Sequence, residues 1–209
     1  MSNMGSIFHF ETADSTNAKA ISLARAGEAE AVVVARRQTG GKGRQGRHFK
    51  SPEGGLYLSV RTSKLAPGAQ VYALTPAAAL AVRRSILRTF GLSCQIKYPN
   101  DLILEGGKVC GILCESLTLP DRFCAVIGVG VNICSDVVLT EEEPAPEYPP
   151  GSLKDFCEKA KAPSALQELE ETLIEELNAL IDRFAAGGTL DEAEYRTYCI
   201  NCPETIIQF

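Results

Sequence analysis

Ten consecutive residues combine positive charge with unusual backbone freedom. The stretch from Gln38 to Arg47 contains four glycines and three cations, and it follows a β-branched run, residues 32–34, that is typical of a buried strand. Glycine lets a backbone approach a ligand closely, and the cations could donate charge-assisted hydrogen bonds to carboxylate or phosphate oxygens. The pattern predicts a cationic loop that closes over an anionic substrate, with a solvated basic surface loop as the alternative.

Two familiar glycine motifs do not fit this stretch. Its glycines spell G-x-G-x-x-G, but a dinucleotide fingerprint needs a helix directly afterwards and an acidic residue about 20 positions later. Residues 48–55 have no helical pattern, and residues 60–65 contain no acid. A phosphate-binding Walker loop fails as well, because Gly43 rather than Ser or Thr follows Lys42.

A second group of polar residues lies between and within predicted strands. The sequence Lys-Tyr-Pro-Asn-Asp at 97–101 forms the turn between two of them. Strand alternation places Lys108 beside Gly111 and a long apolar run, so its ammonium should project from a buried floor. Glycines also interrupt the apolar run 123–133, and glycine inside a strand often marks close approach by a ligand. Each feature alone is as typical of structure as of function.

The elements that must position these residues follow from cap and periodicity signals. Thr75 precedes Pro76, which suits the first position of a helix, and Ser164 with Gln167 makes a capping box. The residues at 14–17 offer further N-cap side chains. We predict four helices, which run from residues 14–17 to Gly27, over 75–90, from 164 to 187 and over 192–198.

Six strands are predicted by runs of β-branched and apolar residues. Glu105-Gly106-Gly107 is a hairpin signal, the acidic, proline-rich residues 136–152 indicate a surface loop, and Thr205 to Phe209 resembles the start of another strand. The sum is one α/β (α+β) domain with a mixed sheet flanked by helices. The strands are expected at 31–35, 56–60, 94–98, 101–104, 108–115 and 123–133.

Composition excludes several classes of protein. With 209 residues, 45% hydrophobic and 22% charged, the chain has the make-up of an ordinary globular protein. A net charge of −5 disfavours generic DNA binding. No apolar run reaches membrane-spanning length and the N-terminus does not resemble a signal peptide, so we expect a cytoplasmic protein. Most of the eight cysteines sit in apolar runs, among them Cys110, Cys114, Cys124 and Cys134, and are expected to be buried, reduced thiols. Cys199 with Cys202 lacks the second pair that a zinc site needs.

Taken together, the motifs closely resemble the catalytic domain of biotin protein ligases. The resemblance runs in unbroken order over about residues 7–200, through 14–17, the glycine-cation loop, 97–101, 107–115 and 128–132. It implies a sheet fold related to class II aminoacyl-tRNA synthetases. It also implies that biotin is activated with ATP and Mg²⁺ to biotinyl-5′-AMP and transferred to a lysine of the biotin carboxyl carrier protein of acetyl-CoA carboxylase.

The resemblance also implies roles for individual residues. Lys108 corresponds to the lysine that neutralises the biotin carboxylate, and Arg44 belongs to the loop that covers biotin and adenylate; these two are the expected catalytic residues. Gly111 and Gly128 are expected to let the bicyclic ring of biotin pack against backbone. The biotin contacts are Ser15, Thr16, Asn17, Gln38, Gly41, Lys42, Gly43, Arg44, Lys108, Gly111 and Gly128. The ATP contacts are Arg44, Phe49, Lys97, Asn100, Asp101 and Asn132, and no protein metal cluster is expected.

The sequence departs from the family pattern at three places. Lys42 replaces the usual arginine, which keeps the charge and loses the bidentate fork, and Tyr98 replaces the usual tryptophan. Residues 1–200 are expected to form the catalytic domain, without a DNA-binding domain before it, and 201–209 to begin a truncated SH3-like domain. We therefore expect biotin binding with slow transfer. A non-catalytic biotin or biotinyl-adenylate binder and a lipoate ligase are the alternatives, and pairing through edge strands would give a homodimer.

Overall fold

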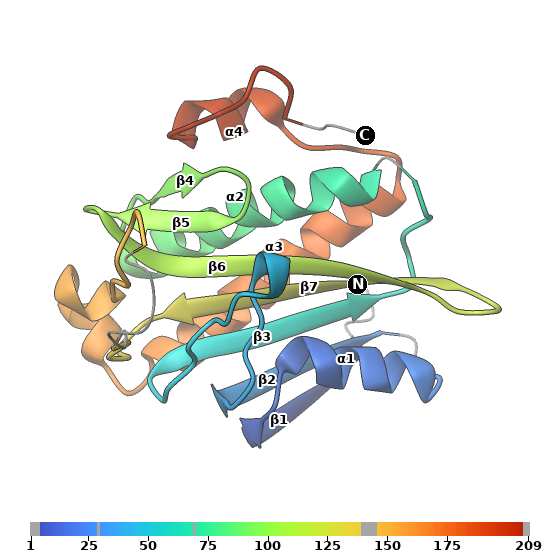
Figure 1. The fold of residues 1–209 in the computed structure, drawn as a ribbon, viewed down its shortest axis with the longest axis horizontal. Coiled ribbons are helices and arrows are strands. Elements are labelled where there is room, and N and C mark those ends of the chain that lie inside the picture. Colours follow the sequence, from blue (N-terminus) through green and yellow to red (C-terminus); the bar gives the residue numbers. More distant parts are fainter. Residues whose placement is uncertain (1–4, 29, 69, 139–145, 207–209) are drawn as a thin grey trace.

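A single mixed sheet of seven strands forms the centre of the computed structural model, which describes residues 5–28, 30–68, 70–138 and 146–206 (Figure 1). Strand β1 pairs with β2 in parallel, and every other neighbouring pair is antiparallel. The predicted α/β (α+β) fold with a mixed sheet is confirmed. In the spatial order β1-β2-β3-β7-β6-β5-β4, the strands are Ser6–Ala13 (β1), Ala31–Gln38 (β2), Gly55–Thr62 (β3), Phe123–Asn132 (β7), Gly107–Thr118 (β6), Asp101–Leu104 (β5) and Gln95–Lys97 (β4).

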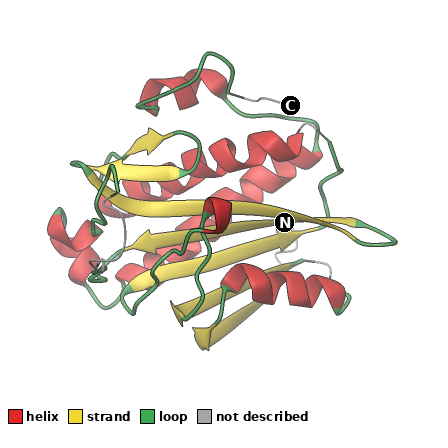
Figure 2. Ribbon diagram, in the orientation of Figure 1, coloured by secondary structure: helices red, strands yellow, loops and turns green. Residues whose placement is uncertain are grey.

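Helices cover both faces of this sheet, as Figure 2 shows. Helix α1 lies on one face, whereas the long helices α2 and α3 pack together on the other, and α4 lies beside β4 at the end of the sheet. None of the helices in the described segments is long and apolar enough to span a membrane. The helices are Thr16–Arg25 (α1), Gln70–Phe90 (α2), Ala165–Ala185 (α3) and Glu192–Tyr198 (α4), with short 3₁₀ turns at Arg44–Gly46 (η1), Leu153–Asp155 (η2) and Glu158–Lys161 (η3).

The unbroken apolar run in β2 is explained by burial on both faces. Val32 and Val34 contribute to the main core under α2 and α3, whereas Val33 packs in a second cluster with Ala20 of α1. Alternate strand residues point to opposite faces, so a strand covered on both sides needs apolar residues at every position. Residues at the ends of such central strands are held by a rigid frame.

Most of the predicted elements are present. The predicted strands correspond to β2 to β7, and the hairpin at Glu105 and Gly106 has positive φ values of 46° and 79°, as a type I′ turn requires. Ser15 caps α1 by accepting a hydrogen bond from the Ala18 amide. Sequence analysis missed strand β1, an edge strand that is exposed along most of its length and therefore lacks a strong apolar pattern.

Two local predictions are wrong. Helix α2 begins at Gln70, so that Pro76 lies inside it, although an interior proline costs about 3 kcal/mol. Ala73 and Leu74 are fully buried in this first part of the helix, and their burial offsets the cost. Ser164 does not cap α3, because its hydroxyl donates to the Glu168 carboxylate at 2.8 Å instead of accepting from a helix amide.

Most of the predicted terminal strand, residues 207–209, lies outside the described residues. Its first two residues, Thr205 and Ile206, are described and are not in a strand, and Ile206 lies in a bend. Part of the predicted loop 136–152 also lies outside them, at 139–145. All eight cysteines are free thiols. Cys110 and Cys124 are buried as expected, and so is Cys94, whereas Cys134 is exposed, contrary to the expectation.

Candidate functional site

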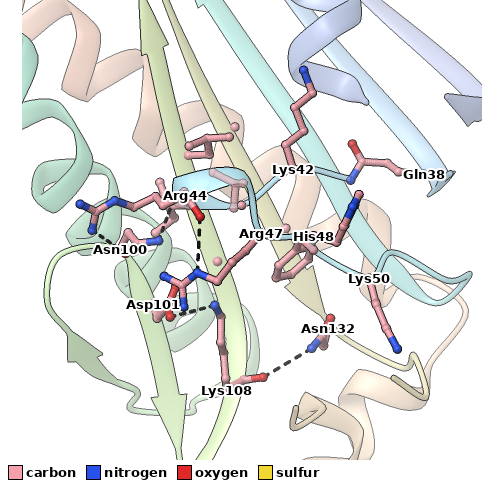
Figure 3. A pocket seen from close by; sticks show the side chains of 18 of the residues that line it. Gln38, Lys42, Arg44, Arg47, His48, Lys50, Asn100, Asp101, Lys108 and Asn132 are labelled. Carbon is pink, nitrogen blue, oxygen red and sulfur yellow. Dashed lines mark hydrogen bonds and ion pairs between the residues drawn. The ribbon is translucent and has the colours of Figure 1, made fainter. Parts of the chain in front are cut away.

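A cavity of about 220 Å³ opens where β6 and β7 meet the loop that follows β2 (Figure 3). It brings together every predicted site residue except Gly41 and Lys97. The predicted residues that line it are Ser15, Thr16, Asn17, Gln38, Lys42, Gly43, Arg44, Phe49, Asn100, Asp101, Lys108, Gly111, Gly128 and Asn132.

A polar wall is built where the end of β2 meets the start of α1. The Gln38 side-chain oxygen accepts hydrogen bonds from the amide and the hydroxyl of Thr16, at 2.8 and 3.1 Å. Asn17 donates to the Glu115 carboxylate at 2.7 Å and accepts from the buried Ser59 hydroxyl at 2.6 Å. Because their partners fix these side chains in advance, the wall is preorganised for a polar, neutral ligand group.

Lys108 extends from β6 into the cavity and forms an ion pair there. Its Nζ lies 2.8 Å from Oδ2 of Asp101, and both side chains are only partly exposed. The other carboxylate oxygen, Oδ1, is buried without a hydrogen-bond partner among the described residues. The Lys108 amide donates to the Pro149 carbonyl at 2.7 Å, and the Gly151 amide donates to the Lys108 carbonyl at 2.9 Å. The ammonium therefore projects from a buried strand, as predicted, with a carboxylate as its present partner.

Asn100 connects the floor of the cavity to its cationic cover. Its side-chain Nδ2 donates to the Ile112 carbonyl at 3.1 Å, and the Ile112 amide donates to the Asn100 carbonyl at 2.9 Å. Its Oδ1 accepts from the Arg44 guanidinium at 3.3 Å. A cis peptide bond joins Tyr98 and Pro99 in the turn that carries it. This turn presents both Asn100 and Asp101 to the cavity.

The glycine-cation loop folds back over the cavity, as Figure 3 shows. The Gly43 amide donates to the Arg47 carbonyl at 2.7 Å, and the Arg47 side chain donates to the Arg44 carbonyl at 3.4 Å. Gly41 faces away from the cavity lining: a Cβ there would lie 2.3 Å from the Phe49 carbonyl oxygen. Because Gly41 has no side chain, the backbone at Gly41 can lie close to the backbone at Phe49.

The ring of Phe49 occupies the space above two strand glycines. A Cβ at Gly111 would lie 2.9 Å from this ring, and one at Gly130 would lie 2.4 Å from it. A Cβ at Gly128 would lie 2.0 Å from Oδ1 of Asn17. In this structure, the strand glycines therefore accommodate protein side chains, and the Phe49 ring separates the polar wall from the Lys108 ammonium, which lies 5.8 Å from its centroid.

The segment 146–150 contributes Pro146, Tyr148 and Pro150 to the cavity lining, although sequence analysis assigned it only to a surface loop. Glu147 pairs with Lys97 at 2.5 Å, and the Lys97 ammonium lies 5.0 Å from the Tyr148 ring centroid. Lys97 thus reaches the cavity indirectly, through Tyr148. No sequence signal connected this segment to Lys108, because pairing between chain segments about 40 residues apart depends on the tertiary fold. Further lining residues that were not predicted are Arg47, His48, Lys50, Ile112, Leu113, Val129, Gly130, Val137, Pro146, Tyr148 and Pro150.

The charge balance of the cavity is opposite to that of the chain. Among the described residues, lysines and arginines line it together with a single carboxylate, that of Asp101, although the whole chain carries a net charge of −5. Several cations lining one cavity favour a ligand with more than one anionic group. The cations are Lys42, Arg44, Arg47, Lys50 and Lys108.

Comparison with known proteins adds independent information. The model of the biotin/lipoate A/B protein ligase family matches residues 10–132. The chain is 33% identical over 178 residues to a biotin–[acetyl-CoA-carboxylase] ligase of Paracoccus denitrificans, which covers 82% of this chain and 72% of that relative. It is 39% identical over 104 residues to the bifunctional ligase/repressor BirA of Bacillus subtilis, covering 49% of this chain and 32% of that relative.

Among solved structures, the chain is similar to biotin protein ligase of Leishmania major in complex with biotinyl-5-AMP. The TM-score is 0.72 at 24% identity, over 96% of this chain and 83% of that chain. At this identity, the likeness establishes a shared fold.

Proposed function

Since the chain belongs to the biotin/lipoate A/B protein ligase family, we propose that its cavity activates biotin with ATP to biotinyl-5′-AMP and then transfers biotin to a lysine of a biotin carboxyl carrier protein. The family membership that the motifs predicted is confirmed. The observation that carries the proposal is the convergence of Lys108 and Arg44 on one cavity beside the Gln38 wall. A cytoplasmic location belongs to the same proposal.

The first half-reaction needs cations because two anions must meet. A carboxylate oxygen of biotin attacks the α-phosphorus of ATP, the new P–O bond gives the mixed anhydride, and pyrophosphate leaves with the electrons of the broken bond. The Lys108 ammonium would hold the carboxylate and stabilise the charge that develops on the phosphoryl oxygens. The Lys108 ammonium has three N–H donors, so it can donate to the biotin carboxylate while it still donates to Asp101, which orients it.

The polar wall would recognise the other end of biotin. Gln38, Thr16 and Asn17 offer hydrogen-bonding groups that are already fixed by their neighbours. A cyclic urea has both donors and an acceptor, and such a wall can satisfy them at little entropic cost. The Phe49 ring, packed over the strand glycines, gives the space between the wall and Lys108 an apolar side.

The second half-reaction needs protection from water. The neutral amine of the carrier lysine attacks the acyl carbon, the amide bond forms, AMP leaves, and the amine loses a proton. Until the carrier arrives, the mixed anhydride would be hydrolysed by water, so a cover over it has a direct chemical use. The glycine-cation loop with Arg44 is placed to act as this cover.

The donor set of the cavity also fits Mg²⁺ brought with ATP. Asp101 Oδ1 and Asn132 Oδ1 are buried oxygens without hydrogen-bond partners in the segments that the structure describes, and both residues line the cavity. Mg²⁺ is commonly held by one or two protein oxygens together with substrate phosphates. When bound, the ion would neutralise phosphate charge, and these two residues would hold it.

Biotin-dependent ATP–pyrophosphate exchange tests the first half-reaction. We expect exchange with biotin and none with lipoate or octanoate, followed by a gain of one biotin per carrier domain in a mass spectrum. Exchange driven by lipoate would place the chain in the other branch of the family. Biotin binding in calorimetry without any exchange would make it a binding protein and would contradict the proposal.

A further inference from the structure

The turn at 97–101 is held from outside the cavity by residues about a hundred positions later. The Tyr98 amide donates to Oδ1 of Asn201 at 2.9 Å, across 103 positions. The Tyr195 hydroxyl donates to the Pro99 carbonyl at 3.3 Å, across 96 positions. None of these four residues lines the cavity. The contacts therefore act on the back of the turn whose front carries Asn100 and Asp101.

The same segment also holds the strand that enters the turn. Cys199 forms a parallel bridge with Ile96 of β4, and the Ile200 amide donates to the Ile96 carbonyl at 2.8 Å. The Tyr98 hydroxyl donates to the Ile206 carbonyl at 2.8 Å. In Figure 1, α4 and the chain after it lie beside β4. The support thus extends along both the strand and the turn.

This support is itself anchored on the core helix α2. The Arg84 Nε donates to the Glu194 carboxylate at 3.0 Å, and the Arg83 guanidinium lies 3.2 Å from the centroid of the Tyr198 ring. Tyr195 is fully buried, and burial raises the pKa of its hydroxyl well above the usual value, so that it remains a donor. A rigid anchor can transmit a defined position, whereas a mobile one could not.

We propose that Asn201 and Tyr195 are positioning residues for the adenylation chemistry. They fix the back of the turn at Tyr98 and Pro99. The front of the same turn presents Asn100 to the glycine-cation loop. The inference rests on the proposed function, because it assumes that Asn100 and Asp101 serve the nucleotide side of the cavity.

The geometry on the front of the turn explains why its position matters. Asp101 orients the Lys108 ammonium at 2.8 Å, and Asn100 accepts a hydrogen bond from Arg44 of the loop. A shift of the turn would therefore move Asp101, which is an expected metal ligand. It would also disturb the two groups that the turn contacts, the Lys108 ammonium and Arg44 of the covering loop. Misplacement by about 1 Å can reduce a rate by about 10²-fold even when the altered residue lies far from the reacting atoms.

Paired variants separate positioning from general stability. Asn201→Ala removes the acceptor of the Tyr98 amide, whereas Asn201→Asp keeps an oxygen at the same place. Tyr195→Phe removes the hydroxyl that binds Pro99, and Tyr198→Phe makes the same chemical change in the same helix, on a ring that stacks on Arg83. We expect kcat for pyrophosphate exchange to fall about tenfold or more in Asn201→Ala and Tyr195→Phe. It should stay near the parent value in Asn201→Asp and Tyr198→Phe.

Two further measurements complete the test. Biotin affinity by calorimetry should fall less than kcat in Asn201→Ala and Tyr195→Phe, because the wall at Thr16 and Gln38 stays in place and only the partner of Lys108 shifts. Amide hydrogen exchange at Tyr98, Asn100 and Asp101 should speed up in Asn201→Ala but not in Asn201→Asp. The inference would be overturned if kcat were equal in Asn201→Ala and the parent. It would also be overturned if amide hydrogen exchange at the turn were the same in both. A parent chain without any pyrophosphate exchange would contradict the proposed function instead, and the hydrogen exchange at the turn would still decide the inference.

Discussion

At the scale of single residues, the cavity contains a cation that already has a partner. The Lys108 ammonium is paired with Asp101 and lies against the face of Phe49, so a substrate carboxylate meets an oriented donor rather than a mobile surface lysine. Orientation before binding lowers the entropic cost of the interaction, which is the physical advantage of holding a lysine in this way.

Replacing Lys108 with alanine should therefore abolish most adenylation while leaving the fold intact. The loss of a charge-assisted hydrogen bond costs about 1.5–3 kcal/mol, which corresponds to about tenfold or more in biotin affinity. The loss of rate should be larger if the contact strengthens in the transition state. Pyrophosphate exchange measures this, with Lys161→Ala as the control, since Lys161 is on η3 and does not line the cavity. Exchange near the parent rate in Lys108→Ala would remove Lys108 from its assigned role.

A second residue-scale prediction concerns Gly130 and Phe49. Gly130→Ala would bring a Cβ to 2.4 Å from the Phe49 ring, so the ring must move or the strand must shift. Overpacking of this kind typically destabilises by about 1–3 kcal/mol. In a Phe49→Ala background, the same substitution should cost much less, because the clashing ring is absent. Urea unfolding of the parent, the two single variants and the double variant tests this prediction. If the changes in the free energy of unfolding simply add, the two groups do not interact.

At the scale of elements, the segment from Thr39 to His48 connects the rigid strand β2 to the cavity. It is held by few internal hydrogen bonds, one of them from the Gly43 amide to the Arg47 carbonyl. Gln45 and Gly46 adopt positive φ values of 57° and 74° within it. Its glycines make ordering costly, and its cations repel one another until an anion arrives.

We expect this loop to exchange amide hydrogens faster without ligand than with biotin and ATP. Arg44→Gly removes the contact with Asn100, so the adenylate should escape more readily and label lysines of an unrelated bystander protein. Bystander labelling at fixed ATP measures the escape, and a reaction without ATP is the control. Equal labelling by Arg44→Gly and parent, with equal hydrogen exchange in both ligand states, would show that the loop is not a cover.

At the scale of the whole molecule, the buried thiols should limit stability at high pH. Burial raises the pKa of Cys94 and of Cys114 from 9.0 to about 12. Both thiols stay neutral in the folded state, whereas in the unfolded chain they ionise above pH 9. The stabilisation is therefore complete below pH 9 and is lost as pH rises toward 12.

The free energy of unfolding should fall in this window by up to about 1.4 kcal/mol per pH unit for each thiol. Cys94→Ala and Cys114→Ala should each flatten the pH dependence, even though each variant is less stable at neutral pH because of the lost side chain. Cys134→Ala, at an exposed position, should leave the slope unchanged. Urea unfolding between pH 8 and pH 11 measures the slopes. Identical slopes in all three variants and parent would mean that these thiols do not control alkaline stability.

The sequence by itself determined the elements whose signals are local. The N-cap at Ser15 and the hairpin at Glu105 and Gly106 depend on neighbouring backbone groups, and both are present as predicted. The ordered motifs identified the family and a little over half of the cavity lining, because residue types at fixed spacings carry that information. Lys108 and Asp101 could be named from their motifs alone.

Only the tertiary structure decided what depends on distant contacts. Pro76 lies inside a helix because burial of its neighbours outweighs local propensity. Tyr148 belongs to the cavity because its segment pairs with β6 at Lys108, and Asn201 supports the turn because α4 is anchored on α2. These contacts join residues about 40 to 100 positions apart, and the free energy that selects them comes from packing the whole chain, so no local pattern could reveal them.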